Sequence, residues 1–287
     1  MKSPKQSDCG TVASAIGARQ TRLRSAAVLA TVWGALWAGG TLVAQENTGA
    51  PSSGALDLSD PKALEQRGDL YMVRKFYPEA IGIYGQLVKL DPRNPVYQNK
   101  LGIAYHQDQN LNAAKRAYRA ALRLNPRYSE ALNNLAAVEY AQKNYRSAIL
   151  TYLKALELSP ASAVVYSNLG TAYFAYKKYE YAMSCYRYAL LLDPKIFESS
   201  GRAGSIVHQR SDQDMAAFNF YLAKTYAGMQ DVENTLQYLN KAWEAGYKDL
   251  SKELTDPVFA FLLEEPRFLD LVARINPEQR PAAAPVP

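Results

Sequence analysis

Histidine and cysteine, which often hold metals or act as nucleophiles, are nearly absent from this chain of 287 residues. The two histidines, His106 and His208, have no metal-ligand partner at helical or turn spacing. The sequence also lacks the GxSxG, HExxH, P-loop and Rossmann patterns that mark common active sites. We therefore expect no enzymatic activity, no cofactor and no metal site.

A run rich in lysine or arginine is also missing, although the formal net charge is +6. Residues 1–44 hold five basic residues against one acidic residue, Asp8, which leaves a net charge of only +2 for the rest of the chain. A chain that is nearly neutral beyond residue 44 has no concentrated positive charge to attract the phosphate groups of nucleic acid. We expect no nucleic acid among the partners.

Residues 1–44 have the pattern of a secretory signal peptide. Three arginines precede an apolar run at 26–44, and the run ends in small residues with a plausible cleavage point after Ala44. Cleavage predicts a secreted or periplasmic protein whose only cysteine is the packing residue Cys185. The run is also about long enough to cross a bilayer, so the alternative is an uncleaved membrane anchor that faces outside the cytoplasm.

A repeat of 34 residues occurs four times in succession between Pro61 and Ile196. The same step relates a leucine-x-proline triplet, an alanine and a tyrosine in each unit: 90–92, 124–126, 158–160 and 192–194; Ala80, Ala114, Ala148 and Ala182; Tyr84, Tyr118, Tyr152 and Tyr186. Each unit splits into two helical patterns of about a dozen residues, and its late proline ends the second helix. Asp60-Pro61 and Asn94-Pro95 each have the pattern of an N-cap followed by proline at the first helical position. Self-similarity at this period predicts a stacked array of helix pairs.

The residue pattern resembles the tetratricopeptide repeat (TPR) family. The second unit carries large apolar, small, aromatic and proline residues at the family's positions: Leu101, Gly102, Tyr105, Leu111, Ala114, Tyr118, Ala121 and Pro126. Three residues depart from the pattern: Arg67 and Leu87 in the first unit, and Glu139, in place of an aromatic residue, in the third. The resemblance implies an all-α fold, a right-handed superhelix of helix pairs that binds other proteins without catalysis.

The pattern divides the chain into a signal peptide or anchor at 1–44, a flexible linker at 45–59, four contiguous TPR units at 60–196, an irregular insert at 197–215, a degenerate fifth unit at 216–249, C-terminal capping helices at 250–276 and a disordered tail at 277–287. The fold class is therefore an all-α TPR solenoid of about five helix pairs. The cap is expected because the last unit of a stack must cover its exposed end.

The sequence predicts how the two helices of each unit pack and which residues form the turn between them. Small residues of the first helices should face alanines of the second helices and let the helix axes approach to roughly 8–10 Å: Gly68, Gly102, Ala136 and Gly170. The turn inside each pair lacks the usual glycine, and we expect asparagine there to adopt the left-handed conformation more readily than lysine.

The resemblance implies a partner on the concave face, which the first helix of each pair mainly forms. Repeat positions 5, 6 and 12 then give candidate peptide-binding residues: Gln66, Asn99, Lys100, His106, Asn133, Asn134, Tyr140, Asn168 and Phe174. Amides would pair with an extended backbone, and aromatic rings would accept its side chains. Asparagine and tyrosine are also common there in the family, so the pattern alone leaves open whether it marks a binding site.

We expect a scaffold or adaptor that binds a protein or peptide partner in this groove outside the cytoplasm, and that meets a membrane only through an uncleaved leader. The alternative is a structural or assembly factor of a cell-envelope complex that acts through its end cap or convex face. A clamp for terminal carboxylates is excluded, because Glu65 and Asp69 stand where such a clamp needs lysine and asparagine.

Overall fold

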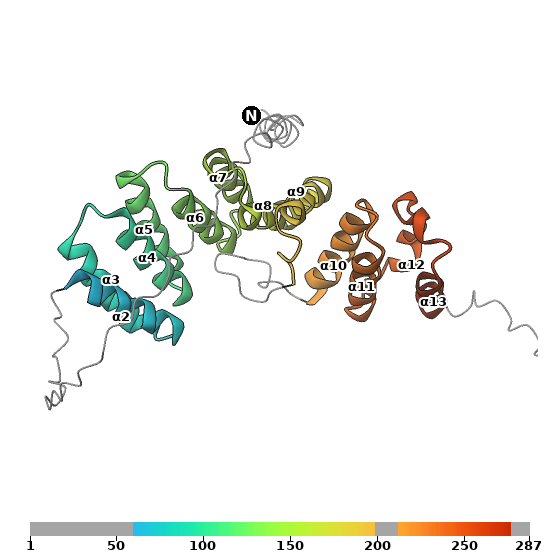
Figure 1. Ribbon diagram of the computed structural model, residues 1–287, viewed down its shortest axis with the longest axis horizontal. Helices are drawn as coiled ribbons and strands as arrows, with labels where there is room; N and C mark the ends of the chain where they lie inside the picture. The colour runs from blue at the N-terminus through green and yellow to red at the C-terminus, as the bar shows by residue number, and fades with distance from the viewer. Residues whose placement is uncertain (1–59, 199–211, 277–287) are drawn as a thin grey trace, which may run out of the picture. The chain divides into compact units, whose positions relative to one another are not determined.

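The computed structural model describes residues 60–198 and 212–276 and, within these ranges, consists of helices without strands (Figure 1). The first four pairs are α2 (Pro61–Val73) with α3 (Tyr77–Leu90), α4 (Pro95–Gln107) with α5 (Leu111–Leu124), α6 (Ser129–Ala141) with α7 (Tyr145–Leu158), and α8 (Ala163–Ala175) with α9 (Tyr179–Leu192). The all-α array of helix pairs is confirmed. The chain divides into two compact units, 1–66 and 67–287, and the site described below lies in the second.

The remaining elements follow the gap at 199–211. They are α10 (Asp212–Ala227), α11 (Val232–Glu244), α12 (Leu250–Glu253), the 3-10 helix η1 (Pro257–Leu262) and α13 (Pro266–Ile275). The fifth pair therefore begins at Asp212, four residues before the expected 216. The leader, the linker, the tail and most of the expected insert lie outside the described residues. Among the residues that are described, no helix is both long and apolar enough to cross a bilayer.

Helix starts follow the local sequence. The carboxylate of Asp60 accepts hydrogen bonds from the backbone N–H groups of Lys62 and Ala63, at 3.1 and 3.2 Å. The side chain of Asn94 accepts one from the N–H of Val96 at 2.9 Å. Each bond satisfies a donor that the first helical turn leaves unpaired. The two predicted N-caps are confirmed.

The core of the repeats is built on the four periodic tyrosines, each at most 2 % exposed. The expectation that small residues face alanines was incomplete. A methyl group added at Gly102 would lie 2.5 Å from Cε1 of Tyr118, and Gly68 and Gly170 stand in the same relation to their own tyrosines, Tyr84 and Tyr186. The first helix thus needs a small residue mainly because a tyrosine ring of the second helix lies against it.

The turn inside each pair uses its middle residue for the left-handed conformation. Lys75, Gln109, Lys143 and Lys177 have φ angles of 59–61°. The asparagines expected there, Asn110 and Asn144, instead directly precede the second helices as N-cap residues. The position is fixed by the turn geometry, so lysine takes it despite the strain that a Cβ atom adds at positive φ.

Glu139, the acidic residue in place of an aromatic, is buried and partnered. It is 4 % exposed and accepts a 2.8 Å hydrogen bond from the hydroxyl of Thr151, and the ammonium of Lys115 lies 3.9 Å away. These contacts join α5, α6 and α7. Partners of this kind offset the desolvation cost of a buried carboxylate.

Candidate functional site

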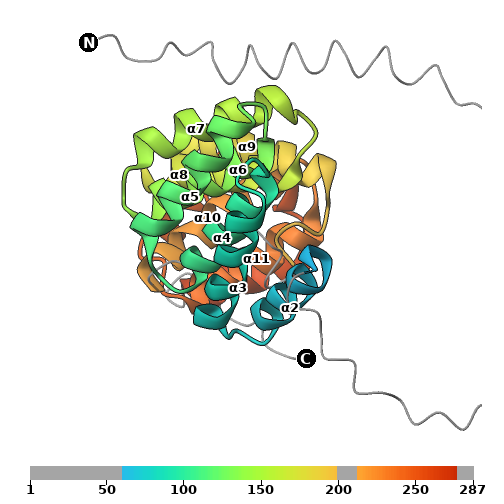
Figure 2. The same cartoon turned by 90° about the vertical axis from the view of Figure 1, so that its left-hand side faces the viewer.

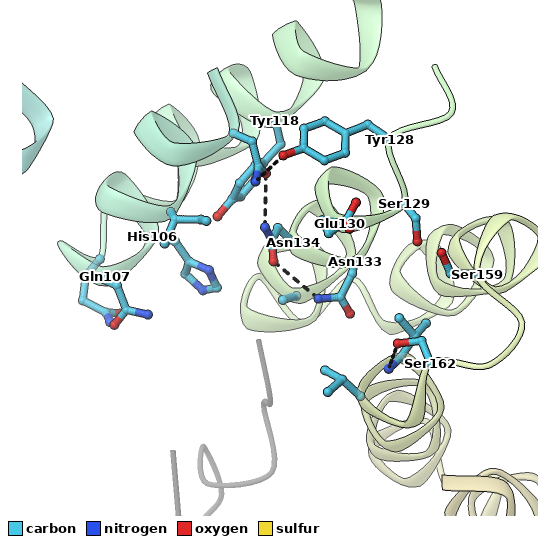
Figure 3. A pocket seen from close by; sticks show the side chains of 16 residues that line it. His106, Gln107, Tyr118, Tyr128, Ser129, Glu130, Asn133, Asn134, Ser159 and Ser162 are labelled. Carbon is cyan, nitrogen blue, oxygen red and sulfur yellow. Dashed lines mark hydrogen bonds between the residues drawn. The ribbon is translucent and has the colours of Figure 1, made fainter. Parts of the chain in front are cut away.

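A pocket of about 570 Å³ opens between α4, α6 and the start of α8, with one wall from α5 (Figure 3). The order of these helices can be followed in Figures 1 and 2. The residues around it include six with amide, imidazole or phenol side chains: Asn99, His106, Tyr118, Tyr128, Asn133 and Asn134. Two successive units supply these six side chains, and the next unit adds Val164 and Val165, so the pocket exists only where these units are stacked.

Asparagine carboxamides form a chain of hydrogen bonds along the pocket. The Nδ2 of Asn134 donates to Oδ1 of Asn99 at 3.1 Å, and the Nδ2 of Asn133 donates to Oδ1 of Asn134 at 3.4 Å. The Nδ2 of Asn168 donates to Oδ1 of Asn133 at 3.0 Å, and a longer contact of 3.5 Å joins Asn99 to the hydroxyl of Tyr128. The amide row predicted from the sequence is thus a ladder that ties α4, α6 and α8 together.

Tyr118 stands behind the pocket lining, and its hydroxyl is fully buried with no hydrogen-bond partner among the described residues. The equivalent hydroxyl of Tyr84 donates to Oδ1 of Asp69 at 2.6 Å. Ile103 occupies the place of Asp69 one repeat later and offers no acceptor. Burial raises the pKa of Tyr118, so its hydroxyl stays protonated at neutral pH.

The pocket has almost no charge. Burial lowers the pKa of His106, so its imidazole is neutral near pH 7 and keeps one accepting nitrogen. Glu130, which is exposed, is the only charged residue among the described lining residues. Burial and the nearby Glu130 raise the pKa of Tyr128, so this hydroxyl is protonated as well. The lining can donate and accept hydrogen bonds, but it offers no cation to an anionic ligand.

The structure separates the residues predicted for the site. Asn99, His106, Asn133 and Asn134 line the pocket together. The other five do not line it: Gln66, Lys100, Tyr140, Asn168 and Phe174.

One of these five is exposed, one is in an ion pair and three are buried. Gln66 is exposed on α2, and Lys100 lies 2.7 Å from the carboxylate of Asp69. Asn168 has no exposed surface, while Tyr140 and Phe174 are 9 % and 6 % exposed. Buried side chains of this kind hold the units together and leave little area for a ligand.

The burial of the aromatic row has a local cause. The ring of Tyr140 packs on Tyr145 with centroids 5.5 Å apart, and Phe174 packs on Tyr179 at 5.4 Å. In both pairs the partner is the first residue of the following helix. The helix after His106 begins with Leu111, which has no aromatic ring to cover the imidazole, and His106 remains half-buried at the pocket.

Sequence reasoning missed the residues at the junctions between units. Tyr128, Ser129, Glu130 and Ser162 line the pocket, and they stand at the last residue of one unit or the first two of the next. Glu130 is the second residue of its unit and lies on the first helix of its pair, the helix expected to form the concave face, so that expectation could have included it. Tyr118 could not, because its repeat position is a core position in every unit.

A second pocket, of about 690 Å³, lies between α11 and α13. Charged side chains of both signs line it, and the guanidinium of Arg267 makes a 2.7 Å ion pair with Glu233 across it. Arg267 and Glu233 are both exposed and already paired with each other. Within 60–198 and 212–276, no group of three or more histidine, cysteine, aspartate or glutamate side chains could hold a metal ion.

Comparisons with known proteins agree on the fold. Family models of the tetratricopeptide repeat match residues 99–163 and 163–196. A search of curated proteins gives no match. Among solved structures, PilF of Pseudomonas aeruginosa is 21 % identical, with 76 % of this chain and 92 % of that chain covered and a TM-score of 0.50.

Two further solved structures resemble the chain more distantly. MamA (41-end) from Desulfovibrio magneticus RS-1 is 19 % identical, with 65 % and 95 % of the two chains covered and a TM-score of 0.47. YrrB, described as a TPR protein with an unusual peptide-binding site, is 17 % identical, with 66 % and 88 % covered and a TM-score of 0.44. Taken with the helix pairs and the 34-residue period, the two family matches establish tetratricopeptide repeats over residues 99–196 of this chain.

Proposed function

We propose that the chain is a non-enzymatic scaffold that holds a segment of a protein partner in the pocket between α4, α6 and α8. Protein binding is the general role that the TPR fold supports. The observation that carries the finer proposal is the asparagine ladder, because it fixes pocket-lining amides on rigid helices before any partner arrives. Prealigned groups bind at a lower entropic cost than mobile ones.

The half-buried Asn134 shows how the ladder serves both roles. One of its two amide N–H groups is used by Asn99, and its oxygen accepts from Asn133. The second N–H is available to an extended peptide backbone that passes over the pocket. Four residues of the proposed surface thus come from the sequence-based set: Asn99, His106, Asn133 and Asn134.

Site-specific crosslinking tests this proposal in the cells that make the protein. A photoreactive amino acid is placed at Gln107 in the first pocket, at Gln237 in the second, or at Lys154 on the exposed surface of α7. We expect capture of a defined protein from Gln107 and none from Lys154. Capture at all three positions alike, or at none, would contradict a pocket-specific scaffold.

The second candidate function, assembly of a cell-envelope complex through the end cap, is favoured by the charged pocket between α11 and α13. It predicts capture from Gln237 without capture from Gln107. Arg267 and Glu233 would then exchange their mutual ion pair for charges of the partner. Such exposed pairs contribute little to stability, so they can be replaced at low cost.

We also propose that the scaffold works outside the cytoplasm, on the support of the leader pattern at 1–44. N-terminal sequencing of the protein isolated from its native cells is expected to begin at Gln45. A start within 1–25, together with recovery in the membrane fraction, would favour the uncleaved anchor instead. Recovery of the intact chain from the cytoplasm would contradict both.

A further inference from the structure

Aromatic rings join the fourth unit to the fifth, away from the pocket described above. The ring of Tyr179, the first residue of α9, is stacked on Tyr221 of α10 with centroids 4.3 Å apart. Tyr221 contacts Phe220 at 5.4 Å, and Phe220 is stacked on Tyr247 at 4.5 Å. All three tyrosines are half-buried, in contrast to the periodic tyrosines of the core, so this cluster reaches the surface of the protein.

Tyr221 occupies the repeat position that belongs to the asparagine ladder. In the third and fourth units, Asn134 and Asn168 directly precede the large apolar and small residues of their helices, and Tyr221 does so in the fifth. The TPR resemblance assigns this position to partner binding. The aromatic cluster is therefore a further candidate surface on the same row of positions, and none of its residues lines the pocket between α4, α6 and α8.

Carboxylates lie close to the hydroxyl groups of this cluster. Burial, and after it neighbours that include Glu253 and Glu180, raise the pKa of Tyr221 to about 12. Burial, and after it neighbours that include Tyr221 and Glu253, raise the pKa of Tyr247. Both hydroxyl groups therefore stay protonated at neutral pH, and their oxygens can accept hydrogen bonds. The surface combines phenol rings, hydroxyl oxygens and negative charge.

No cation of the protein is paired with these carboxylates. The lysines within five residues of Glu180 or Glu253 in the sequence form no ion pair with either carboxylate in the part of the chain that the structure describes. Lys224, the only basic residue within α10, lies 2.6 Å from Asp256 instead. None of the groups that shift the pKa of Tyr221 is a cation. The negative charge thus has no internal partner.

We propose that this surface binds the side chain of an arginine in a protein partner; its residues are Tyr179, Glu180, Tyr221, Tyr247 and Glu253. A guanidinium group has five N–H donors in one plane and packs well against tyrosine rings. It pairs with the carboxylates of Glu180 and Glu253, and the hydroxyl oxygen of Tyr221 accepts a further hydrogen bond. The proposal goes beyond the scaffold function, which concerns the pocket between α4, α6 and α8.

Other side chains of a partner match this surface less well. A carboxylate or a phosphate group would be repelled by Glu180 and Glu253. An apolar side chain would contact the rings but would leave the negative charge without a partner. Lysine has the charge of arginine, but its three donors stand on one atom and its ammonium does not stack on a ring as a planar guanidinium does.

Three variant proteins separate this surface from the general charge of the molecule. Glu180→Gln combined with Glu253→Gln removes both carboxylates with little change of shape. Glu79→Gln combined with Glu157→Gln removes two exposed carboxylates on α3 and α7, so the net charge changes by the same amount. Tyr221→Phe keeps the stacked ring and removes its hydroxyl group.

Binding is measured at low ionic strength with the full chain and end-capped nonapeptides of glycine and serine with one central arginine. A second peptide has citrulline, which has the shape of arginine without its charge. Ligand-observed NMR gives the dissociation constants, because it reports weak binding. We expect the arginine peptide to bind at least about fivefold more tightly than the citrulline peptide.

The variants are expected to differ in this preference. The Glu180→Gln, Glu253→Gln protein should lose most of it, to about twofold or less, while the Glu79→Gln, Glu157→Gln protein retains it. Tyr221→Phe should reduce it about twofold or more, because one acceptor is lost. Circular dichroism of each variant shows that a loss of binding is not a loss of fold.

Three outcomes would overturn the proposal. Equal binding of the two peptides would show that the surface does not recognise a guanidinium group. Equal effects of the two double variants would reduce the preference to the overall charge. An unchanged preference in Tyr221→Phe would remove the aromatic cluster from the site. Each is separable from failure of the scaffold proposal, because crosslinking from Gln107 reports on the pocket alone.

Discussion

Single residues decide how closely the two helices of a unit can pack. The methyl group that alanine adds at Gly102 would lie 2.5 Å from Cε1 of Tyr118, well inside contact distance. We expect Gly102→Ala to lower the free energy of unfolding by about 1–3 kcal/mol, because the ring must shift in a packed core. Urea unfolding followed by circular dichroism measures this difference.

The control for this substitution is Gly82→Ala, on the exposed side of α3. A methyl group there meets no atom within 4 Å, and alanine favours a helix over glycine. We expect Gly82→Ala to raise the free energy of unfolding by about 0.5–1 kcal/mol. If both substitutions changed the free energy of unfolding in the same direction, helix propensity, and not the tyrosine contact, would control both sites.

Titration of one residue links stability to pH. Burial lowers the pKa of His106 from 6.5, so below that pH the unfolded chain takes up a proton that the folded chain refuses. The contribution of His106 is therefore fully present above pH 6.5 and declines as the pH falls from 6.5 toward the lowered pKa. We expect His106→Gln to remove this part of the decline. Urea unfolding of both proteins between pH 8 and 5 measures it, and a constant difference between them would count against a buried, neutral imidazole.

At the scale of an element, the turn inside each helix pair carries strain that glycine would remove. Lys143 joins α6 to α7 with φ at 61°, where a Cβ atom is disfavoured. We expect Lys143→Gly to raise the free energy of unfolding by about 1 kcal/mol. The same substitution at Lys154, within α7, should lower it by about 1 kcal/mol. Opposite signs in thermal or urea unfolding would confirm the assignment of the turn residue.

At the scale of the whole molecule, the C-terminal elements are joined to the array through Asp256. Its carboxylate lies 2.6 Å from the ammonium of Lys224 on α10, and it also accepts from the N–H of Val258 at the start of η1. The hydrogen bond from Lys224 holds the pKa of Asp256 below its usual value. One side chain thus pairs with the fifth unit and starts the cap.

Two substitutions separate these roles. Asp256→Asn keeps an acceptor for Val258 and loses the charge, so we expect a loss of about 1 kcal/mol in the free energy of unfolding. Asp256→Ala loses both contacts and should cost about 2–3 kcal/mol. Limited proteolysis after Asp256→Ala is expected to cleave first within 250–276. Equal losses for the two variants would argue against a role for the N-cap.

Prediction from sequence succeeded where neighbouring residues carry the signal. The N-caps at Asp60 and Asn94 and the end of each second helix before its proline follow from local hydrogen bonding and from the fixed φ of proline. The expectation for the turns was displaced by one residue, because the geometry of the turn fixes which residue has positive φ. Helix α10 begins four residues before 216, the expected start of the fifth unit, in a stretch where the period is lost and gives no signal for a helix start.

By itself, the sequence determined that this protein is an array of helix pairs with buried tyrosines, since a strict 34-residue step imposes the same local structure and the same core in every unit. Only the tertiary structure decided which amides meet. Asn134 reaches Asn99, and Asn168 reaches Asn133, across 35 residues, one more than the period. That offset arises from the stacking of one unit on the next, and the same stacking forms the pocket between α4, α6 and α8.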